Sequence, residues 1–296
     1  MATAREIRRR IRSIGNIRQI TRALEAVSAS KVRRAQEQVT ATRPYAARAR
    51  ELLASVASLT GGEARHPLLS THPNVVNIGM LVVSSDRGLA GAFNTNVARL
   101  AMEKARELGK PTSYVTIGKK GRDFLYRRGG EVIADFSPLP PHPTLLDTTS
   151  ATRTLTDDFL AGKVDEVLLV YTQFISRAVQ KPIAVQLLPL VAETIVSSVV
   201  TSGPRPVYDF EPGPSEILDT LLPRLTELQV YQAVLESLAS EHAARMAAMR
   251  NATDSASDLI TGYTLSYNKA RQQGITSELL DISGGAEALA QLVRAG

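Results

Sequence analysis

The chain has 296 residues, 44% of them hydrophobic, which is enough for at least one domain with a substantial core. The absence of cysteine excludes disulfides, thiolate metal sites and a cysteine nucleophile, and the four histidines are too far apart for a short-range metal motif, although a site assembled from distant segments stays open. No uninterrupted apolar run reaches the roughly 18 to 20 residues of a membrane span. The net charge is +6, and its concentration at the N-terminal end indicates an acidic partner surface, nucleic acid or membrane headgroups.

The first predicted element is one long helix over residues 3–58. Its composition is dominated by good helix formers, and Pro44 is its first proline, where we expect a kink or a break. Between Ile7 and Val27, apolar side chains recur at steps of three and four, close to the period of a coiled coil. The basic charge is concentrated here, because residues 1–34 carry ten Lys and Arg against two Glu.

A linker over residues 61–74 leads into a segment of different character. Within it, we expect strands at 75–84, 112–117, 165–171 and 182–190, helices at 94–109, 119–128 and 150–161, and a proline-rich loop at 136–149. Strands that alternate with helices predict a mostly parallel sheet with helices on its faces. The sequence therefore predicts a central Rossmann-like α/β domain over residues 74–205.

After a break at 201–214, a second long helix is predicted from Ser215 to about Ser283, with Pro223 either kinking it or marking its start. At about 1.5 Å per residue the two helices would be roughly 80 and 100 Å long, whereas the central domain would be only some 30 to 35 Å across. They must therefore project and bury their apolar stripes on each other. The predicted fold class is α/β, with a long antiparallel coiled coil of N-terminal (1–60) and C-terminal (214–296) helices plus the central domain.

The motif SSDRGLAGAFNTN, residues 84–96, directly follows a predicted strand. Gly88 and Gly91 allow a tight turn, and such a turn before a helix can hold a phosphate. The motif matches neither a dinucleotide-binding fingerprint nor a Walker A loop, and it lacks the Walker lysine. A structural turn that presents Asp86 and Arg87 to a partner is the favoured interpretation.

The sequence offers little catalytic machinery. It contains none of the common nucleophile, zinc-protease or phosphate-loop motifs. The adjacent carboxylates Asp157-Asp158 and Asp165-Glu166 are typical of solvated charge at element ends rather than of catalysis. The residues alone therefore favour no catalytic, cofactor-binding or metal site. The resemblance described below implies that the chain by itself is not an enzyme.

Two helical stretches remain open to more than one interpretation. The basic N-terminal stripe fits a solvated flank of a coiled coil, nucleic acid or an acidic protein surface, although the lack of aromatic residues in the first 44 positions weakens a base-stacking role. Residues 240–276 combine many small side chains with many hydrogen-bonding groups. That composition fits either an exposed polar face or a helix that faces several surfaces in turn.

Three segments resemble gamma subunits of F-type ATP synthases. They are the run IRRRIRSIGNIRQITRALEAVSASKVRRAQ (7–36), the motif SSDRGLAGAFNTN (84–96), and residues 239–289, which include NKARQQGIT. Residues 97–205 carry little of the resemblance. The chain departs from the family pattern at Leu24 and Ala26, where many members have methionine, and at Ala90, where cysteine is common.

The resemblance implies a rotor shaft inside a ring of three alpha and three beta subunits, with the α/β domain near the epsilon subunit and the c-ring. It implies peripheral attachment at the cytoplasmic face of the bacterial inner membrane, no cofactor and no nucleic-acid partner. Matching the motifs residue by residue implies beta-subunit contacts for the following side chains: Arg8, Arg9, Arg12, Arg87, Arg245, Arg271, Gln272 and Thr276.

Two other functions stay open at this point. A basic coiled-coil protein that binds RNA or DNA would use the N-terminal arginines, and its affinity would fall steeply with salt. A Rossmann-like enzyme with helical extensions would bind a nucleotide at residues 84–96.

Overall fold

The computed structural model describes residues 3–59, 66–72, 74–190 and 214–295. The chain divides into two compact units, one of residues 1–27 with 248–296 and one of residues 28–247. In chain order the elements are α1 (Ala4–Leu59), the 3-10 helix η1 (Pro67–Leu69), β1 (Ile78–Val83), α2 (Phe93–Leu108), β2 (Thr112–Ile117), α3 (Lys119–Tyr126), β3 (Glu131–Asp135), α4 (Leu145–Leu160), β4 (Glu166–Phe174), β5 (Gln180–Leu188) and α6 (Pro214–Ala295).

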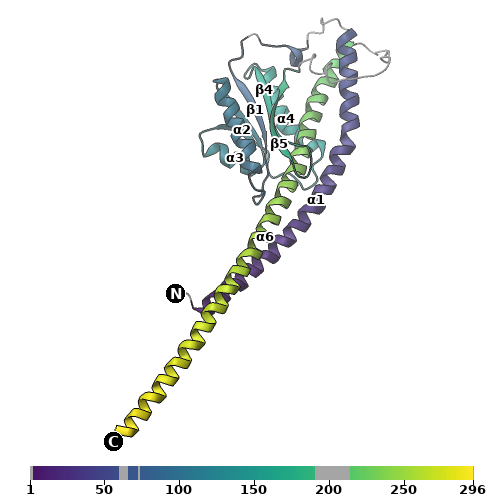
Figure 1. Ribbon diagram of the computed structural model, residues 1–296. Helices are drawn as coiled ribbons and strands as arrows, with labels where there is room; N and C mark the ends of the chain where they lie inside the picture. The colour runs from purple at the N-terminus through teal and green to yellow at the C-terminus, as the bar shows by residue number, and fades with distance from the viewer. Residues whose placement is uncertain (1–2, 60–65, 73, 191–213, 296) are drawn as a thin grey trace. The chain divides into compact units, whose positions relative to one another are not determined.

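A five-stranded sheet forms the centre of the unit of residues 28–247 (Figure 1). Its strand order is β3-β2-β1-β4-β5, and every neighbouring pair is parallel except β4 and β5. The predicted mostly parallel sheet is therefore confirmed. The antiparallel edge follows from a short connection, since the five residues between β4 and β5 allow a hairpin but no crossover helix.

Both faces of this sheet are covered by helices. Alternate residues of β1, such as Met80 and Val82, pack against α2 and α3, where Val97 and Leu125 are fully buried. The intervening residues, such as Leu81, pack in a second core with α4 and the first part of α6. Burial on both faces explains why β1 reads as a continuous apolar run rather than an alternating one.

The two predicted long helices are confirmed, with 56 residues in α1 and 82 in α6. Pro44 lies inside α1 and Pro223 inside α6, and neither divides its helix. The two helices run antiparallel (Figure 1), so the predicted coiled coil is also confirmed. Within the larger unit, Val32, Ala35 and Val39 of α1 share a buried cluster with Leu235, Ala239 and Ala243 of α6.

Several predicted boundaries are wrong for identifiable reasons. β1 begins at Ile78 rather than at residue 75, because the backbone amides of Val76 and Asn77 donate to the Asp165 carboxylate at 2.7 and 2.9 Å. The short edge strand β3 was not predicted, since it begins and ends on charged residues and is only partly buried. The predicted loop at 136–149 is shorter than expected, because Thr144 and Asp147 form a capping box that starts α4 at Leu145.

The end of the last helix was also predicted too early. The helical pattern was predicted to end at about Ser283, but α6 continues through Gly284 and Gly285 to Ala295. Of the predicted linker, residues 66–72 contain η1, while residues 61–65 and 73 lie outside the described residues. Residues 191–213, which hold most of the predicted break at 201–214, also lie outside them. No helix in the described part of the chain has an apolar stretch suited to crossing a bilayer.

Candidate partner-contact site

The motif of residues 84–96 forms the connection between β1 and α2, and its polar side chains are bonded within the chain. The Ser84 hydroxyl donates to the Gly118 carbonyl at 2.9 Å and accepts from the Gly121 amide at 2.8 Å. The Ser85 amide donates to the Asn94 side-chain oxygen at 2.9 Å. These bonds make the connection a structural turn, which agrees with the first half of the favoured interpretation; the presentation of Asp86 and Arg87 to a partner stays a prediction.

Asp86 ties this turn to two other segments. Its carboxylate accepts from the backbone amide of Lys119, at the start of α3, at 3.1 Å. It also accepts from the amide of Leu139, in the proline-rich loop, at 3.2 Å. Asp86 therefore organises the carboxyl ends of β1 and β2 from inside the chain and is not free to bind a partner with both oxygens.

Arg87 and Leu89 are the side chains that this turn exposes. Arg87 is exposed, and its own carbonyl oxygen accepts from the Ser85 hydroxyl at 2.7 Å. Leu89 has a positive φ of 63° and is 66% exposed. A left-handed backbone costs a residue that carries a Cβ about 1 to 2 kcal/mol, so other contacts must hold Leu89 in this conformation.

Arg245 on α6 has a different environment from the other predicted contacts. Its Nε and Nη2 donate to the carbonyl oxygen of Gly88 at 3.3 and 3.2 Å. Nη2 also lies 2.7 Å from a carboxylate oxygen of Glu241, and both side chains are only 13% exposed. The guanidinium of Arg245 is thus committed mainly to contacts within the chain.

Two titratable groups beside Arg245 have shifted pKa values. Burial raises the pKa of Glu241, although the ion pair with Arg245 works in the opposite direction. Burial, together with the smaller effects of the positive charges of Arg245 and Lys31, lowers the pKa of His242 to about 4. Arg245 Nη1 lies 3.3 Å from His242 Nδ1, which fits a neutral imidazole that accepts a hydrogen bond from the guanidinium.

The remaining predicted contacts belong to the unit of residues 1–27 and 248–296. All of them are exposed on their helices; on α1 these are Arg8, Arg9 and Arg12, and on α6 Arg271, Gln272 and Thr276. None of them takes part in an ion pair among the described residues. The structure therefore brings Arg245 into contact with the turn that carries Arg87, and leaves these six side chains directed to solvent.

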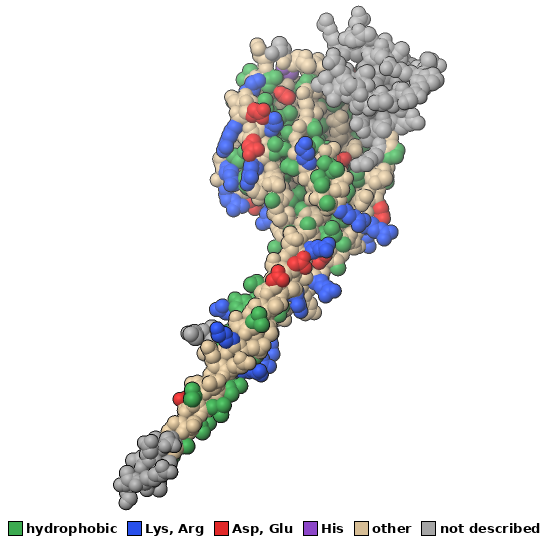
Figure 2. Space-filling view, viewed as in Figure 1, with side chains coloured by type: hydrophobic (Ala, Val, Ile, Leu, Met, Phe, Trp, Pro, Cys, Tyr) green, Lys and Arg blue, Asp and Glu red, His purple; other side chains and the backbone are tan. Residues whose placement is uncertain are grey.

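A charged groove of about 820 Å³ lies between the two helices of this smaller unit. It is lined by Arg18 and Arg22 of α1 and Arg250 of α6, together with the acidic residues Glu25 and Asp254. On the face seen in Figure 2, Lys and Arg side chains recur along these helices. The three arginines of the groove are not among the contacts predicted from the sequence.

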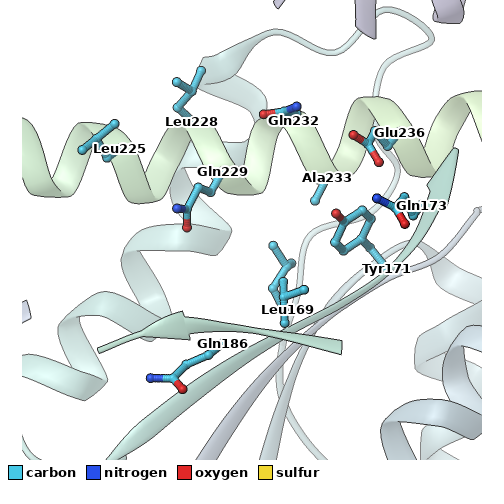
Figure 3. A pocket seen from close by; sticks show the side chains of 11 residues that line it. Leu169, Tyr171, Gln173, Gln186, Leu225, Leu228, Gln229, Gln232, Ala233 and Glu236 are labelled. Carbon is cyan, nitrogen blue, oxygen red and sulfur yellow. The ribbon is translucent and has the colours of Figure 1, made fainter. Parts of the chain in front are cut away.

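A cavity of about 360 Å³ lies between the sheet and α6 in the larger unit (Figure 3). Tyr171 and Gln173 of β4 line it from one side, and Gln229, Gln232 and Glu236 of α6 from the other. No Lys or Arg occurs among its described lining residues. It therefore lacks the positive charge that a nucleotide phosphate requires.

The two acidic pairs considered for catalysis have structural roles. Asp165 accepts the two amides that precede β1, and its pKa is lowered by these hydrogen bonds, the one from Asn77 contributing most. Asp158 pairs with Lys163 at 2.7 Å across the end of α4. These contacts agree with charge at element ends, but the predicted solvation is wrong for Asp158 and Asp165, whose side chains are only 17% and 16% exposed.

Glu241, His242 and Gly88 belong to the Arg245 site but were not predicted from the sequence. The spacing of Glu241 and Arg245 could have signalled their ion pair, because residues four apart share one face of a helix. No local pattern could have revealed Gly88, which is separated from Arg245 by 157 positions.

Comparison with known proteins identifies the family. A family model described as ATP synthase matches residues 3–289. The ATP synthase gamma chain of Dehalococcoides mccartyi is 47% identical, with 98% of this chain and all of the relative covered. The gamma chain of Chloroflexus aurantiacus is 46% identical, with 98% and 99% covered.

Solved structures agree in fold. A chain from the Euglena gracilis mitochondrial ATP synthase (OSCP/F1/c-ring) has a TM-score of 0.65 at 19% identity, covering 97% of this chain and 94% of that one. A chain of the Tetrahymena thermophila central stalk and c-ring has a TM-score of 0.58 at 22% identity, covering 79% and 99%. At these identities the likeness concerns the fold alone, whereas the sequence matches span nearly the whole length. The chain belongs to the ATP synthase gamma-chain family.

Proposed function

We propose that this chain is the central rotor shaft of an F-type ATP synthase. In this role it couples ion translocation through the membrane sector to ATP synthesis on the beta subunits, and it performs no catalysis itself. Its partners are the alpha and beta subunits, the epsilon subunit and the c-ring. It acts as a peripheral component at the cytoplasmic face of the bacterial inner membrane.

The observation that carries this proposal is the uncovered C-terminal part of α6. Several large apolar side chains there are mostly exposed, with Leu265 at 69%, Leu279 at 63% and Ile282 at 70%. Apolar side chains repeated along one helix indicate a surface that another protein covers. A ring of subunits around the coiled coil supplies that cover, which agrees with the family of the chain.

Polar contacts suit a shaft that must turn inside such a ring. Exposed ion pairs contribute only about 0 to 1 kcal/mol each, so contacts spread over many cations resist slipping without creating one deep energy minimum. We propose beta-subunit contacts for Arg8, Arg9, Arg12 and Arg87 and for the polar set Arg271, Gln272 and Thr276. The charged groove with Arg18, Arg22 and Arg250 provides further cations for acidic segments of the beta subunits.

The two competing functions have less support. The nucleic-acid alternative has no support from the family match or from the relatives, which are named ATP synthase gamma chains. The enzyme alternative needs a phosphate cradle at residues 84–96, but Ser84, Ser85 and Asp86 are engaged in hydrogen bonds within the chain.

Co-purification from the native membrane tests the proposal. A tagged chain should bring down six larger ATP-binding subunits, and vesicles that contain the complex should synthesise ATP when an ion gradient is imposed. Recovery of the chain with nucleic acid and without these subunits would contradict the proposed function.

A further inference from the structure

The guanidinium of Arg245 forms a tie between α6 and the turn that connects β1 to α2. It donates two hydrogen bonds to the Gly88 carbonyl oxygen, at 3.3 and 3.2 Å. The ion pair with Glu241, one helical turn earlier, holds the guanidinium from the side of α6. A planar guanidinium can satisfy both partners at once because its donors point in fixed directions.

The groups around Arg245 restrict its guanidinium to the contacts with Gly88 and Glu241. Arg245 and Glu241 are each 13% exposed, and His242 presents Nδ1 to the remaining side of the guanidinium at 3.3 Å. Lys31 of α1 and Asp86 of the turn act electrostatically on Glu241. A partly buried charge with several partners within the chain is strongly directed toward them, so Arg245 has little capacity left for another protein.

The hydrogen bonds from Arg245 hold the backbone just before Leu89, a residue with an unfavourable positive φ. The carbonyl of Arg87 is held by the Ser85 hydroxyl at 2.7 Å, and the next carbonyl, of Gly88, is held by Arg245. Leu89 follows in the left-handed region with φ 63°. Two successive carbonyls are thus anchored immediately before the unfavourable residue, and the anchored segment exposes Arg87 and Leu89.

We propose that Arg245 is a positioning residue for the rotor–stator contact. It holds the Gly88 carbonyl on α6 and thereby fixes the orientation in which Arg87 and Leu89 are presented to the beta subunits. A turn that is held firmly on α6 transmits force from this helix to the partner. A loosely held turn would move relative to α6 and transmit less force. This role differs from the direct beta-subunit contact that sequence resemblance implies for Arg245, and its consequence for coupling rests on the proposed function.

The first experiment uses the isolated full-length chain. Because the chain contains no cysteine, Leu89→Cys introduces a single attachment site for a nitroxide spin label. We expect Arg245→Gln to shift the label's spectrum toward fast motion, Arg245→Lys to produce a smaller shift in the same direction, and Arg224→Gln, at an exposed position of the same helix, to cause none. Circular dichroism of each variant verifies that it is folded.

Unchanged label motion in folded Arg245→Gln and Arg245→Lys would overturn the proposal, because a residue that only touches a partner has no effect on the turn in the free chain. Glu241→Gln offers a second route if Arg245→Gln fails to fold. It weakens the support of the guanidinium and should also increase the motion of the label. Equal motion in folded Glu241→Gln and the parent chain would likewise count against the tie.

The second experiment measures coupling in the assembled complex. If Arg245 acts through the turn, Arg87→Ala and Arg245→Gln should be non-additive, and the double variant should lose less ATP synthesis than the two single losses predict. Additive losses would overturn the positioning role. Failure of the chain to assemble with alpha and beta subunits would contradict the proposed function, while the spin-label result would still test the tie.

Discussion

The hydroxyl oxygens of Thr21 and Thr253 lie 2.8 Å apart, joining α1 to α6 within the coiled coil. Each hydroxyl also lies within hydrogen-bond distance of a carbonyl of its own helix, that of Arg18 at 3.0 Å and that of Met249 at 2.9 Å. Two hydroxyls have two protons for three contacts, so one donates across the interface and the other donates to its own helix. A polar contact of this kind favours one register of a coiled coil.

Replacing Thr21 and Thr253 by valine, singly and together, measures this contact. We expect a coupling free energy of about 0.5 to 1.5 kcal/mol from a double-mutant cycle, read from denaturant unfolding followed by circular dichroism. Thr261→Val is the matched control, because that hydroxyl bonds only within its own helix. A coupling free energy of zero would show that the two hydroxyls contribute to stability independently.

Gly118 should tolerate no side chain. Its φ is +102°, and a Cβ at this position would collide with the carbonyl group of Ser84. We expect Gly118→Ala to lower the free energy of unfolding by roughly 3 kcal/mol or more, since backbone strain and a backbone clash act together.

Gly129→Ala provides the comparison, measured by the same thermal and denaturant unfolding. Gly129 also has a positive φ, +77°, but nothing lies within 4 Å of the added Cβ. Its cost should stay near the 1 to 2 kcal/mol of a left-handed residue. Equal costs for Gly118→Ala and Gly129→Ala would rule out the close approach to Ser84.

Acid should destabilise the chain through His242. Its folded pKa of about 4 lies below the ordinary 6.5, so between these values the unfolded state binds a proton that the folded state does not. Stability from this group is present above pH 6.5 and is lost as pH falls toward 4, by roughly 3 kcal/mol in all.

His242→Gln isolates this effect from the neighbouring charges. Glu241, whose raised pKa acts with the opposite sign, is retained in the variant, as are Arg245, Lys31 and Asp86. The stability of the parent chain relative to His242→Gln should therefore fall as pH is lowered from 6.5 to 4. A difference that is independent of pH would show that His242 does not resist protonation.

Removing Arg271 and Gln272 together should weaken coupling. Both side chains are exposed on α6, so the double alanine variant should leave the stability of the isolated chain nearly unchanged while reducing assembly or ATP synthesis in reconstituted vesicles. Lys269→Ala removes a cation from the same segment and serves as the control. Normal coupling in the Arg271→Ala/Gln272→Ala variant would make the proposed contact wrong.

The elements with strong local patterns were predictable from the sequence. Composition and spacing identify α1 and α6, and continuous apolar runs identify β1 and β4, because the physical causes lie within a few residues of each other. The errors occur where a residue that is distant in the sequence determines the local structure. β1 starts late because Asp165 binds the two preceding amides, and β3 forms because β2 offers it an edge to pair with.

By itself, the sequence determined that two long helices flank an α/β domain, which segments carry the family motifs, and which residues are candidate partner contacts. Only the tertiary structure decided how those candidates differ. It exposes Arg87 and Arg271, but it directs Arg245 inward to Gly88 and Glu241. Helical periodicity specifies on which side of α6 an arginine lies, whereas its hydrogen-bond partners depend on which distant segment the folded chain brings to that side.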